Sequence, residues 1–231
     1  MHSGPPWLDT IERIVYVTAD RSFIDGEVLF VPKVLTTLAL IILLNCCCSK
    51  DEPTSSPEPE KSALIPLEIG NVWQYVDTLF GEPPRISAIT ESVDVVQELN
   101  GQTWYRTQQK AVSDGVTYSF EYLTCNRADG YYWLPLSNAD TVPRLVWKYP
   151  AEIGDTFNLQ GSARTIVKST NAVITSPAGT FSCYLYAWEY APGMLRSDST
   201  WIAPCVGIVK YVSVDSTTVT SVRRLTAYQH Q

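Results

Sequence analysis

The sequence predicts an all-β protein. Residues 63–231 are expected to form an antiparallel sheet, either a curved half-barrel or a sandwich, preceded by a signal-peptide helix and a disordered linker. The chain of 231 residues is rich in side chains that suit a pleated, half-buried surface, with 13 Tyr and 7 Trp. After residue 63, short apolar and aromatic runs alternate with turn signals at hairpin spacing. This region shows no helical pattern and no strand–helix alternation, which disfavours a parallel sheet.

The predicted strands follow one another in hairpins along a single domain. Asn100-Gly101 separates a long strand over 86–99 from one over 103–111, because this dipeptide favours a two-residue turn. Ser113-Asp114-Gly115 forms the next turn, and residues 117–125 alternate cleanly between two faces. The other predicted strands cover 72–76, 131–134, 145–147, 156–159, 164–168, 172–175 and 219–228, and a last hairpin pairs 181–190 with 201–214.

The acidic balance and the scarcity of histidine exclude several classes of function. The formal net charge is −7, so the chain lacks the basic surface that neutralises phosphates, and nucleic acid is not an expected partner. The sequence contains only His2 and His230, and neither lies in a patterned segment. Histidine-dependent catalytic triads and histidine–metal sites are therefore not expected, and we predict no cofactor and no metal.

An apolar run near the N-terminus has the length of a secretion signal. Residues 34–45 are largely apolar, but a bilayer-spanning helix needs about 20 such residues. Lys33 supplies the positive flank of a signal peptide, which we place at residues 31–46. A short buried core helix is the alternative. We interpret residues 1–30 as a mis-annotated segment upstream of a true start at Val31; a real N-terminal extension is the other interpretation.

The end of the apolar run resembles the lipobox of bacterial lipoproteins. Leu44-Asn45-Cys46-Cys47 places a leucine three positions before Cys47, although Gly, Ala or Ser usually precedes the lipidated cysteine. The resemblance implies that Cys47, with Cys48 as the rival position, carries acyl chains that hold the protein at a membrane. Ser49-Lys50-Asp51-Glu52 is similar to an export signal of surface-exposed outer-membrane lipoproteins. The implied location is the bacterial cell envelope.

A polar segment follows the predicted lipidation site. Residues 49–62 hold three prolines, four serines and one threonine, and no large apolar side chain. Such a segment buries too little apolar surface to offset its ordering entropy. We therefore predict that residues 47–62 comprise the lipidated cysteine and a disordered linker, which tethers the β domain of residues 63–231.

Three stretches of the domain resemble the β-rich domains of poorly characterised bacterial lipoproteins. They are Pro66–Tyr75, Ser176–Tyr184 with its Pro-Ala-Gly-Thr-Phe turn, and Trp201–Tyr211 with its Trp-x-Ala-Pro-x-Val-Gly pattern. Cys205 stands where that family commonly has glycine. The resemblance implies an envelope lipoprotein with a β half-barrel similar to lipid-carrier domains, and it supplies no catalytic residues to carry over.

Cysteines of the domain allow two interpretations. If the hairpin of 181–190 and 201–214 folds about Met194, Cys183 and Cys205 lie opposite each other, within disulfide range. The alternative is that these residues and Cys125 are separate thiols that behave as small apolar side chains. A cysteine metal site lacks suitable spacing and a fourth ligand.

The remaining candidates are an aromatic strand face and scattered carboxylates. Tyr184, Tyr186, Trp188 and Tyr190 share one face, which could bind a glycan or a lipid; one face of a β core is the favoured interpretation. Candidate glycosidase acids are Glu121, Asp155, Glu189 and Asp198, but their spacing selects no pair. The sequence thus favours a non-enzymatic, membrane-anchored module that binds a hydrophobic ligand or an envelope protein. A carbohydrate-binding or glycoside-hydrolysing surface lipoprotein is the alternative.

Overall fold

A computed structural model describes residues 63–136, 142–158, 163–190 and 196–231. The predicted leader, Cys47, Cys48 and the linker lie outside the described residues. Within the described residues, no helix has the length and apolar character needed to cross a membrane.

Every regular element of the described chain is a strand, as the sequence predicts. The strands form one 12-stranded antiparallel sheet in the order β6-β5-β4-β3-β2-β1-β12-β11-β10-β9-β8-β7. Their bounds are β1 Val72–Leu79, β2 Arg85–Leu99, β3 Gln102–Ser113, β4 Val116–Arg127, β5 Gly130–Pro135, β6 Arg144–Lys148, β7 Thr156–Asn158, β8 Arg164–Ser176, β9 Gly179–Glu189, β10 Arg196–Ala203, β11 Gly207–Asp215 and β12 Thr218–Gln229.

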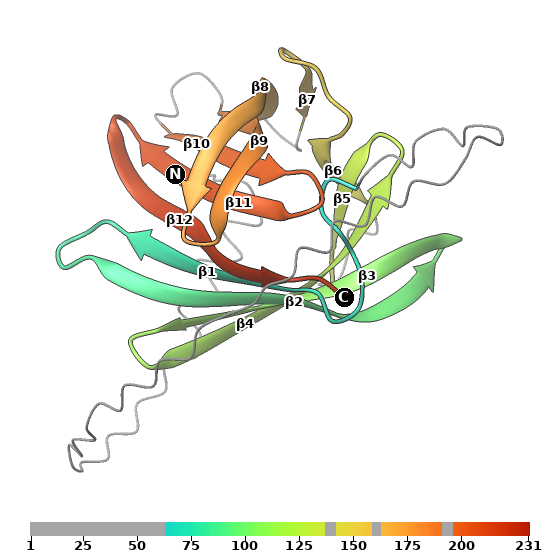
Figure 1. Ribbon diagram of the computed structural model, residues 1–231, viewed down its shortest axis with the longest axis horizontal. Helices are drawn as coiled ribbons and strands as arrows, with labels where there is room; N and C mark the ends of the chain where they lie inside the picture. Colours follow the sequence, from blue (N-terminus) through green and yellow to red (C-terminus); the bar gives the residue numbers. More distant parts are fainter. Residues whose placement is uncertain (1–62, 137–141, 159–162, 191–195) are drawn as a thin grey trace, which may run out of the picture.

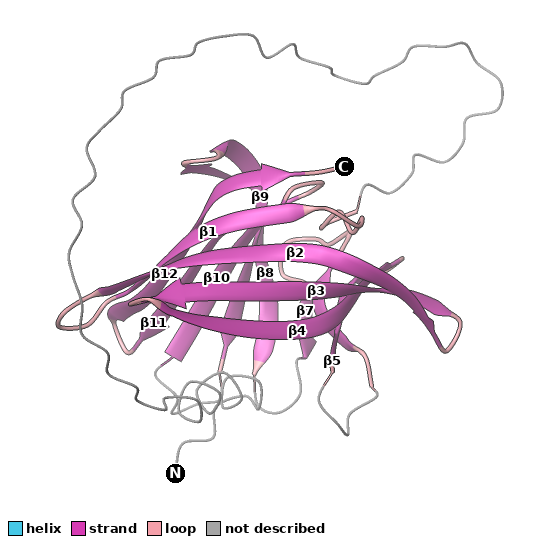
Figure 2. Cartoon of the chain, turned by 90° about the horizontal axis from the view of Figure 1, so that it is seen from below, coloured by secondary structure: helices cyan, strands magenta, loops and turns pink. Residues whose placement is uncertain are grey.

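The sheet is strongly curved and nearly closes into a barrel-like shape (Figure 1). Strands β1 to β4 run side by side along one wall, and β8 to β11 form the facing wall (Figure 2). The segment between the two edge strands, β6 and β7, helps to close the gap. Lys148 Nζ lies 2.8 Å from Asp155 Oδ2, and Gly154 N donates to Val167 O over 2.8 Å. The predicted fold class is confirmed, in its half-barrel form.

The main core fills the concave side of the sheet at one end. Residues 64–67 enter it ahead of β1, and Leu64 is 1% exposed. This segment is bonded to both walls, because Asn126 Nδ2 on β4 donates to Ile65 O over 2.8 Å and Cys205 N donates to Ala63 O over 3.0 Å. A smaller cluster of Trp104, Leu123, Cys125 and Leu134 packs separately on β3, β4 and β5.

The predicted strand over 201–214 is wrong, because the chain turns in its middle. β10 ends at Ala203, β11 begins at Gly207, and the two strands pair with each other. Cys205 has φ 61° and Gly207 has φ 108°, values that a continuous strand does not contain. Trp73 Nε1 holds the turn by donating to Val206 O over 2.6 Å. The segments predicted over 164–168 and 172–175 are one strand, β8, with irregular pairing between them.

Candidate binding site on the concave face

Polar and aromatic side chains form a band across the concave face, next to the apolar core. Directly paired residues of antiparallel strands point to the same face, and Asp77 pairs with Arg223, which in turn pairs with Tyr211. Tyr75, two residues before Asp77, belongs to the core, which places this face inside. The residues that define this band, called the polar belt below, are Asp77, Glu91, Tyr122, Asp198, Tyr211 and Arg223.

Glu91 on β2 lies at the centre of the first wall. Tyr122 Oη on β4 donates to Glu91 Oε1 over 2.5 Å, and Gln109 on β3 also bonds the carboxyl group. Burial raises the pKa of Glu91 above its ordinary value, while the bond from Tyr122 and the charge of Arg223 oppose that rise. The carboxyl group therefore keeps its proton to a higher pH than a solvated glutamic acid does.

Asp77 and Arg223 join the two walls where β1 meets β12. Arg223 Nη2 lies 3.3 Å from Asp77 Oδ2, and Ser221 Oγ donates to Asp77 Oδ1 over 2.8 Å. The guanidinium also lies 6.0 Å from the ring centroid of Tyr75. Arg223 Nε is buried and has no hydrogen-bond partner among the described residues. The Nε–H group of Arg223 can therefore still donate a hydrogen bond, on a face where most other polar groups of the belt already have hydrogen-bond partners.

Asp198 on β10 anchors the second wall. Its side chain is 0% exposed, and Tyr190 Oη donates to its Oδ2 over 2.6 Å. Arg196 Nε approaches Oδ1 at 3.5 Å and supplies the opposite charge. Burial, with the charge of Asp198 next, raises the pKa of Tyr211 to about 12. Burial, followed by the charge of Asp198, also raises the pKa of Tyr190, so both tyrosines stay protonated and remain hydrogen-bond donors at neutral pH.

The polar belt has the chemistry of a binding surface. It offers hydroxyl and guanidinium donors beside carboxylate acceptors, and five of its members are half-buried while Asp198 is buried. No group of histidine, cysteine and carboxylate side chains that could hold a metal occurs among the described residues. A bound molecule with a polar group would meet several directional hydrogen-bonding partners here.

The aromatic face predicted on β9 divides between the core and the belt. Tyr186 is 0% exposed and Trp188 is 7% exposed. Tyr186 Oη donates to Lys148 O over 2.8 Å, and its ring stacks with that of half-buried Tyr184 at 6.2 Å. Tyr190 bonds Asp198 in the belt. Packing therefore accounts for the positions of Tyr184, Tyr186 and Trp188.

The predicted partners Cys183 and Cys205 are both free thiols in this structure. The hairpin register explains the difference from the prediction. Ser197 pairs with Glu189 and Ile202 with Tyr184, so the hairpin does not fold about Met194. Cys183 lies buried within β9, whereas Cys205 lies exposed beyond the end of β10 in the turn to β11. Burial raises the pKa of Cys183 to about 11.

The carboxylates considered for glycosidase chemistry are dispersed. Glu189 pairs with Arg164 and Lys168, Asp155 pairs with Lys148, and Glu121 accepts a bond from Gln108. Only Asp198 belongs to the polar belt. Among described tryptophans, Trp133 and Trp201 are half-buried and the others are buried, so none offers an exposed platform for a sugar ring.

The sequence did not point to Asp77, Glu91, Tyr122, Tyr211 and Arg223 as site residues. Each is the polar or amphipathic member of an alternating strand, and such a position usually faces solvent. Arg223 lies in the Arg223-Arg224 pair, where Arg224 is exposed and Arg223 is half-buried. Successive side chains of a strand alternate between its two faces, so Arg223 and Arg224 are expected to point to opposite faces. Only the tertiary fold shows which of the two faces is concave.

Comparisons with known proteins show similarity of a limited degree to solved structures alone. No family model matches the chain, and no curated protein matches it. One similar solved structure is a Bacteroides fragilis protein described as exported and having a YmcC-like fold, with 16% identity over 73% of this chain and 100% of that chain and a TM-score of 0.48. Another, described as a lipoprotein of Parabacteroides distasonis, has 15% identity over 73% of this chain and 99% of that chain and a TM-score of 0.43. Similarity at this level carries no conclusion about function.

Proposed function

We propose that this chain is a non-enzymatic, lipid-anchored binding module of the bacterial envelope, and that its concave face binds a hydrophobic ligand that carries a polar group. The observation that carries the proposal is the position of the polar belt. It lies between a filled apolar core on one side and exposed apolar hairpin ends on the other. An amphipathic molecule can place its polar group on the belt and its apolar part along the hairpin ends.

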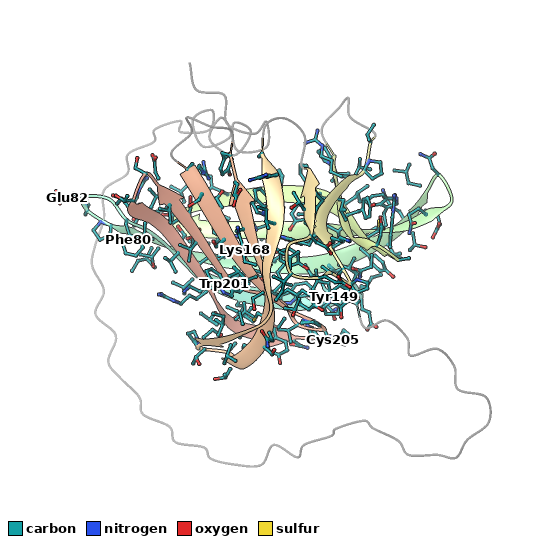
Figure 3. All side chains as sticks on the ribbon, turned by 90° about the horizontal axis from the view of Figure 1, so that it is seen from above. Phe80, Glu82, Tyr149, Lys168, Trp201 and Cys205 are labelled. Carbon is teal, nitrogen blue, oxygen red and sulfur yellow. The ribbon has the colours of Figure 1, made fainter. Side chains whose placement is uncertain are left out.

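Exposed apolar side chains gather at the ends of three hairpins. These ends lie together because β1 pairs with β2 and β12, and β3 pairs with β2 and β4. Phe80 lies at this end, away from Tyr149 and Cys205 (Figure 3). The residues that define the apolar rim, with their exposures, are Leu79 41%, Phe80 52%, Val116 50% and Val219 40%. Apolar groups left in water at one site favour association with an apolar partner.

The rim lies at the opposite end of the domain from Ala63, the residue at which the predicted linker would join it. Ala63 bonds the turn between β10 and β11. Strand β11 runs from that turn, at Gly207, to the hairpin end at Asp215. A strand of this length spans roughly 25–30 Å. A domain held by its Ala63 end would therefore present the rim away from its point of attachment.

A matched pair of substitutions on β3 tests the binding face. Gln109 and Gln108 are adjacent and half-buried, and Gln109 is paired with Phe120 and Glu91 on the concave side whereas Gln108 points to the opposite face. Gln109→Trp should fill space beside the polar belt and weaken binding of the apolar probe N-phenyl-1-naphthylamine roughly tenfold or more, a loss of about 1.4 kcal/mol. Gln108→Trp should bind the probe as the wild type does.

Fluorescence titration of the full chain measures this binding, and native mass spectrometry tests whether a lipid copurifies. Equal probe affinity in both variants and the wild type would contradict binding on the concave face. Absence of both probe binding and a copurified lipid would favour an envelope protein as the partner instead.

A further inference from the structure

Among the described residues, the first half of strand β4 has no neighbouring strand on one side. β3 pairs with β4 from Val116 to Thr124, but β5 pairs only with Tyr122 to Arg127. Residues 116–121 have no other backbone hydrogen bond among the described residues. This stretch, called the free edge below, protrudes beyond β5 along the lower border of the sheet in Figure 2.

The turn between β3 and β4 shows which backbone groups point outward. Asp114 and Gly115 have φ 51° and 76°, as in a two-residue type I′ turn. Such a turn makes Ser113 and Val116 a hydrogen-bonded pair, after which every second pair exchanges bonds. Thr117 and Ser119 therefore direct their N–H and C=O groups away from β3. Both residues are exposed.

Residues 116–120 of the free edge lack the features that normally prevent strands from pairing with other chains, and the one charged residue of the free edge, Glu121, lies at its end. Proteins protect such edges with lysine, proline, bulges or short strands. The exposed border of β8 beyond Val167 has two of these protective features. They are Lys168 and an irregular pairing register between Val167 and Ala172. Residues 116–120 contain β-branched and aromatic side chains, no proline and no charge, and their pairing with β3 is regular.

We propose that the free edge of β4 pairs antiparallel with the same edge of a second copy of this chain. Tyr118 then lies opposite Tyr118 of the second copy, and Val116 lies opposite its Phe120. Thr117 lies opposite Ser119 and supplies, with it, the outward donors and acceptors of two symmetric hydrogen-bonded pairs. Aromatic and β-branched residues are favourable cross-strand partners, and no charged residue faces another in this register.

The length of the free edge selects this register. In this register, the number of a residue and the number of the residue opposite it in the second copy add up to 236. Gly115 of the second copy therefore lies opposite Glu121. The second strand therefore ends next to Tyr122, which is the residue where β5 begins to occupy the edge. A shift by two residues in one direction would bring Val116 of the second copy against Tyr122, whose partner on that side is already Pro135. A shift by two residues in the other direction would leave fewer residues of the free edge paired. The two sheets would join into one continuous sheet through a two-fold axis.

Sedimentation velocity of the full chain in detergent tests this interface. The wild type should sediment as a dimer that dissociates on dilution. Thr117→Lys places a charge at the centre of the interface and should raise the dissociation constant roughly tenfold or more. Thr175→Lys is the matched control, because Thr175 is an exposed threonine on β8, at the border that is already protected.

Ser119→Pro provides a second variant in case Thr117→Lys does not fold. It removes an outward N–H and leaves the bonds to β3 in place, so the circular dichroism spectrum should be unchanged while the dimer is lost. A wild type that stays monomeric at every concentration, or a Thr117→Lys variant that dimerises as the wild type does, would overturn the proposal. The inference does not rest on the proposed ligand, since probe fluorescence and sedimentation report separate properties.

Discussion

Glu91 shows how one position on a strand combines burial with charge. It pairs with Trp73 of the core on one side and with Gln109 on the other. Its carboxyl group accepts a hydrogen bond from Tyr122, and this bond and the positive charge of Arg223 both lower its pKa. Burial raises the pKa by more, so the pKa of Glu91 is raised overall. Keeping an ionised carboxylate at this position therefore costs folding free energy, which is unusual outside binding and catalytic sites.

The raised pKa makes stability depend on pH. The folded state binds the proton of Glu91 more tightly than the unfolded state does. The proton on Glu91 therefore stabilises the folded state fully at a pH below the ordinary pKa of glutamic acid. This stabilisation is lost as the pH rises from the ordinary pKa through the raised pKa of Glu91 in the folded state. Glu91→Gln, which cannot ionise, should gain stability relative to the wild type over that interval. Urea denaturation of the wild type and of Glu91→Gln between pH 4 and pH 8 checks this, and a difference in stability that does not grow with pH would contradict it.

At the scale of the elements, turns and strand starts are placed by close backbone contacts. Gly130 opens β5 with φ 150°, and a Cβ there would come within 2.2 Å of the carbonyl oxygen of Trp147 on β6. Gly101, in the turn between β2 and β3, has φ 72° and nothing within 4 Å of such a Cβ. The first glycine allows two strands to approach, whereas the second only permits the turn conformation.

These two glycines should therefore respond differently to alanine. Gly130→Ala should lower the free energy of unfolding by about 3 kcal/mol or more, because a backbone atom blocks the new methyl group. Gly101→Ala should cost only about 1 kcal/mol, the penalty of the left-handed conformation. Chemical denaturation of both variants measures the difference. Equal losses would show that the β5–β6 contact relaxes without cost.

At the scale of the whole molecule, the segment before β1 holds the two walls together. Ile65 O accepts a bond from Asn126 in the first wall, and Ala63 O accepts one from Cys205 in the second. Leu64, Ile65 and Leu67 are buried in the core between the walls. Strand pairing joins the walls through β1 and β12, and this segment adds a second connection that fills the closed end of the half-barrel.

Truncation of this segment should therefore destabilise the entire domain. Leu64→Ala should lower the free energy of unfolding by about 2–5 kcal/mol, as expected for a leucine removed from a packed core. Leu79→Ala, at the exposed rim, should change it by about 0.5 kcal/mol or less. Urea unfolding followed by tryptophan fluorescence gives both values. A small effect of Leu64→Ala would mean that the walls are stable without the inserted segment.

The sequence alone determined the β architecture, because alternating apolar side chains and turn dipeptides are local signals. Asn100-Gly101 and Asp114-Gly115 mark two turns directly, and both have the expected positive φ. The run 201–214 misled the prediction, since the turn over Pro204–Val206 is fixed by the bond from Trp73, a residue distant in sequence. The leader and lipidation site remain sequence predictions.

Only the tertiary structure decided which side chains meet. Asp77 and Arg223 are far apart in the chain but paired across β1 and β12, and Glu91 reaches Tyr122 over the intervening strand β3. One of the two sequence interpretations placed Cys183 opposite Cys205, on the condition that the hairpin folds about Met194, but the register of β9 and β10 separates them. Local sequence specifies that a residue alternates between two faces. The curvature and register of the whole sheet specify which face is enclosed and which residues share it, because these depend on contacts between distant segments.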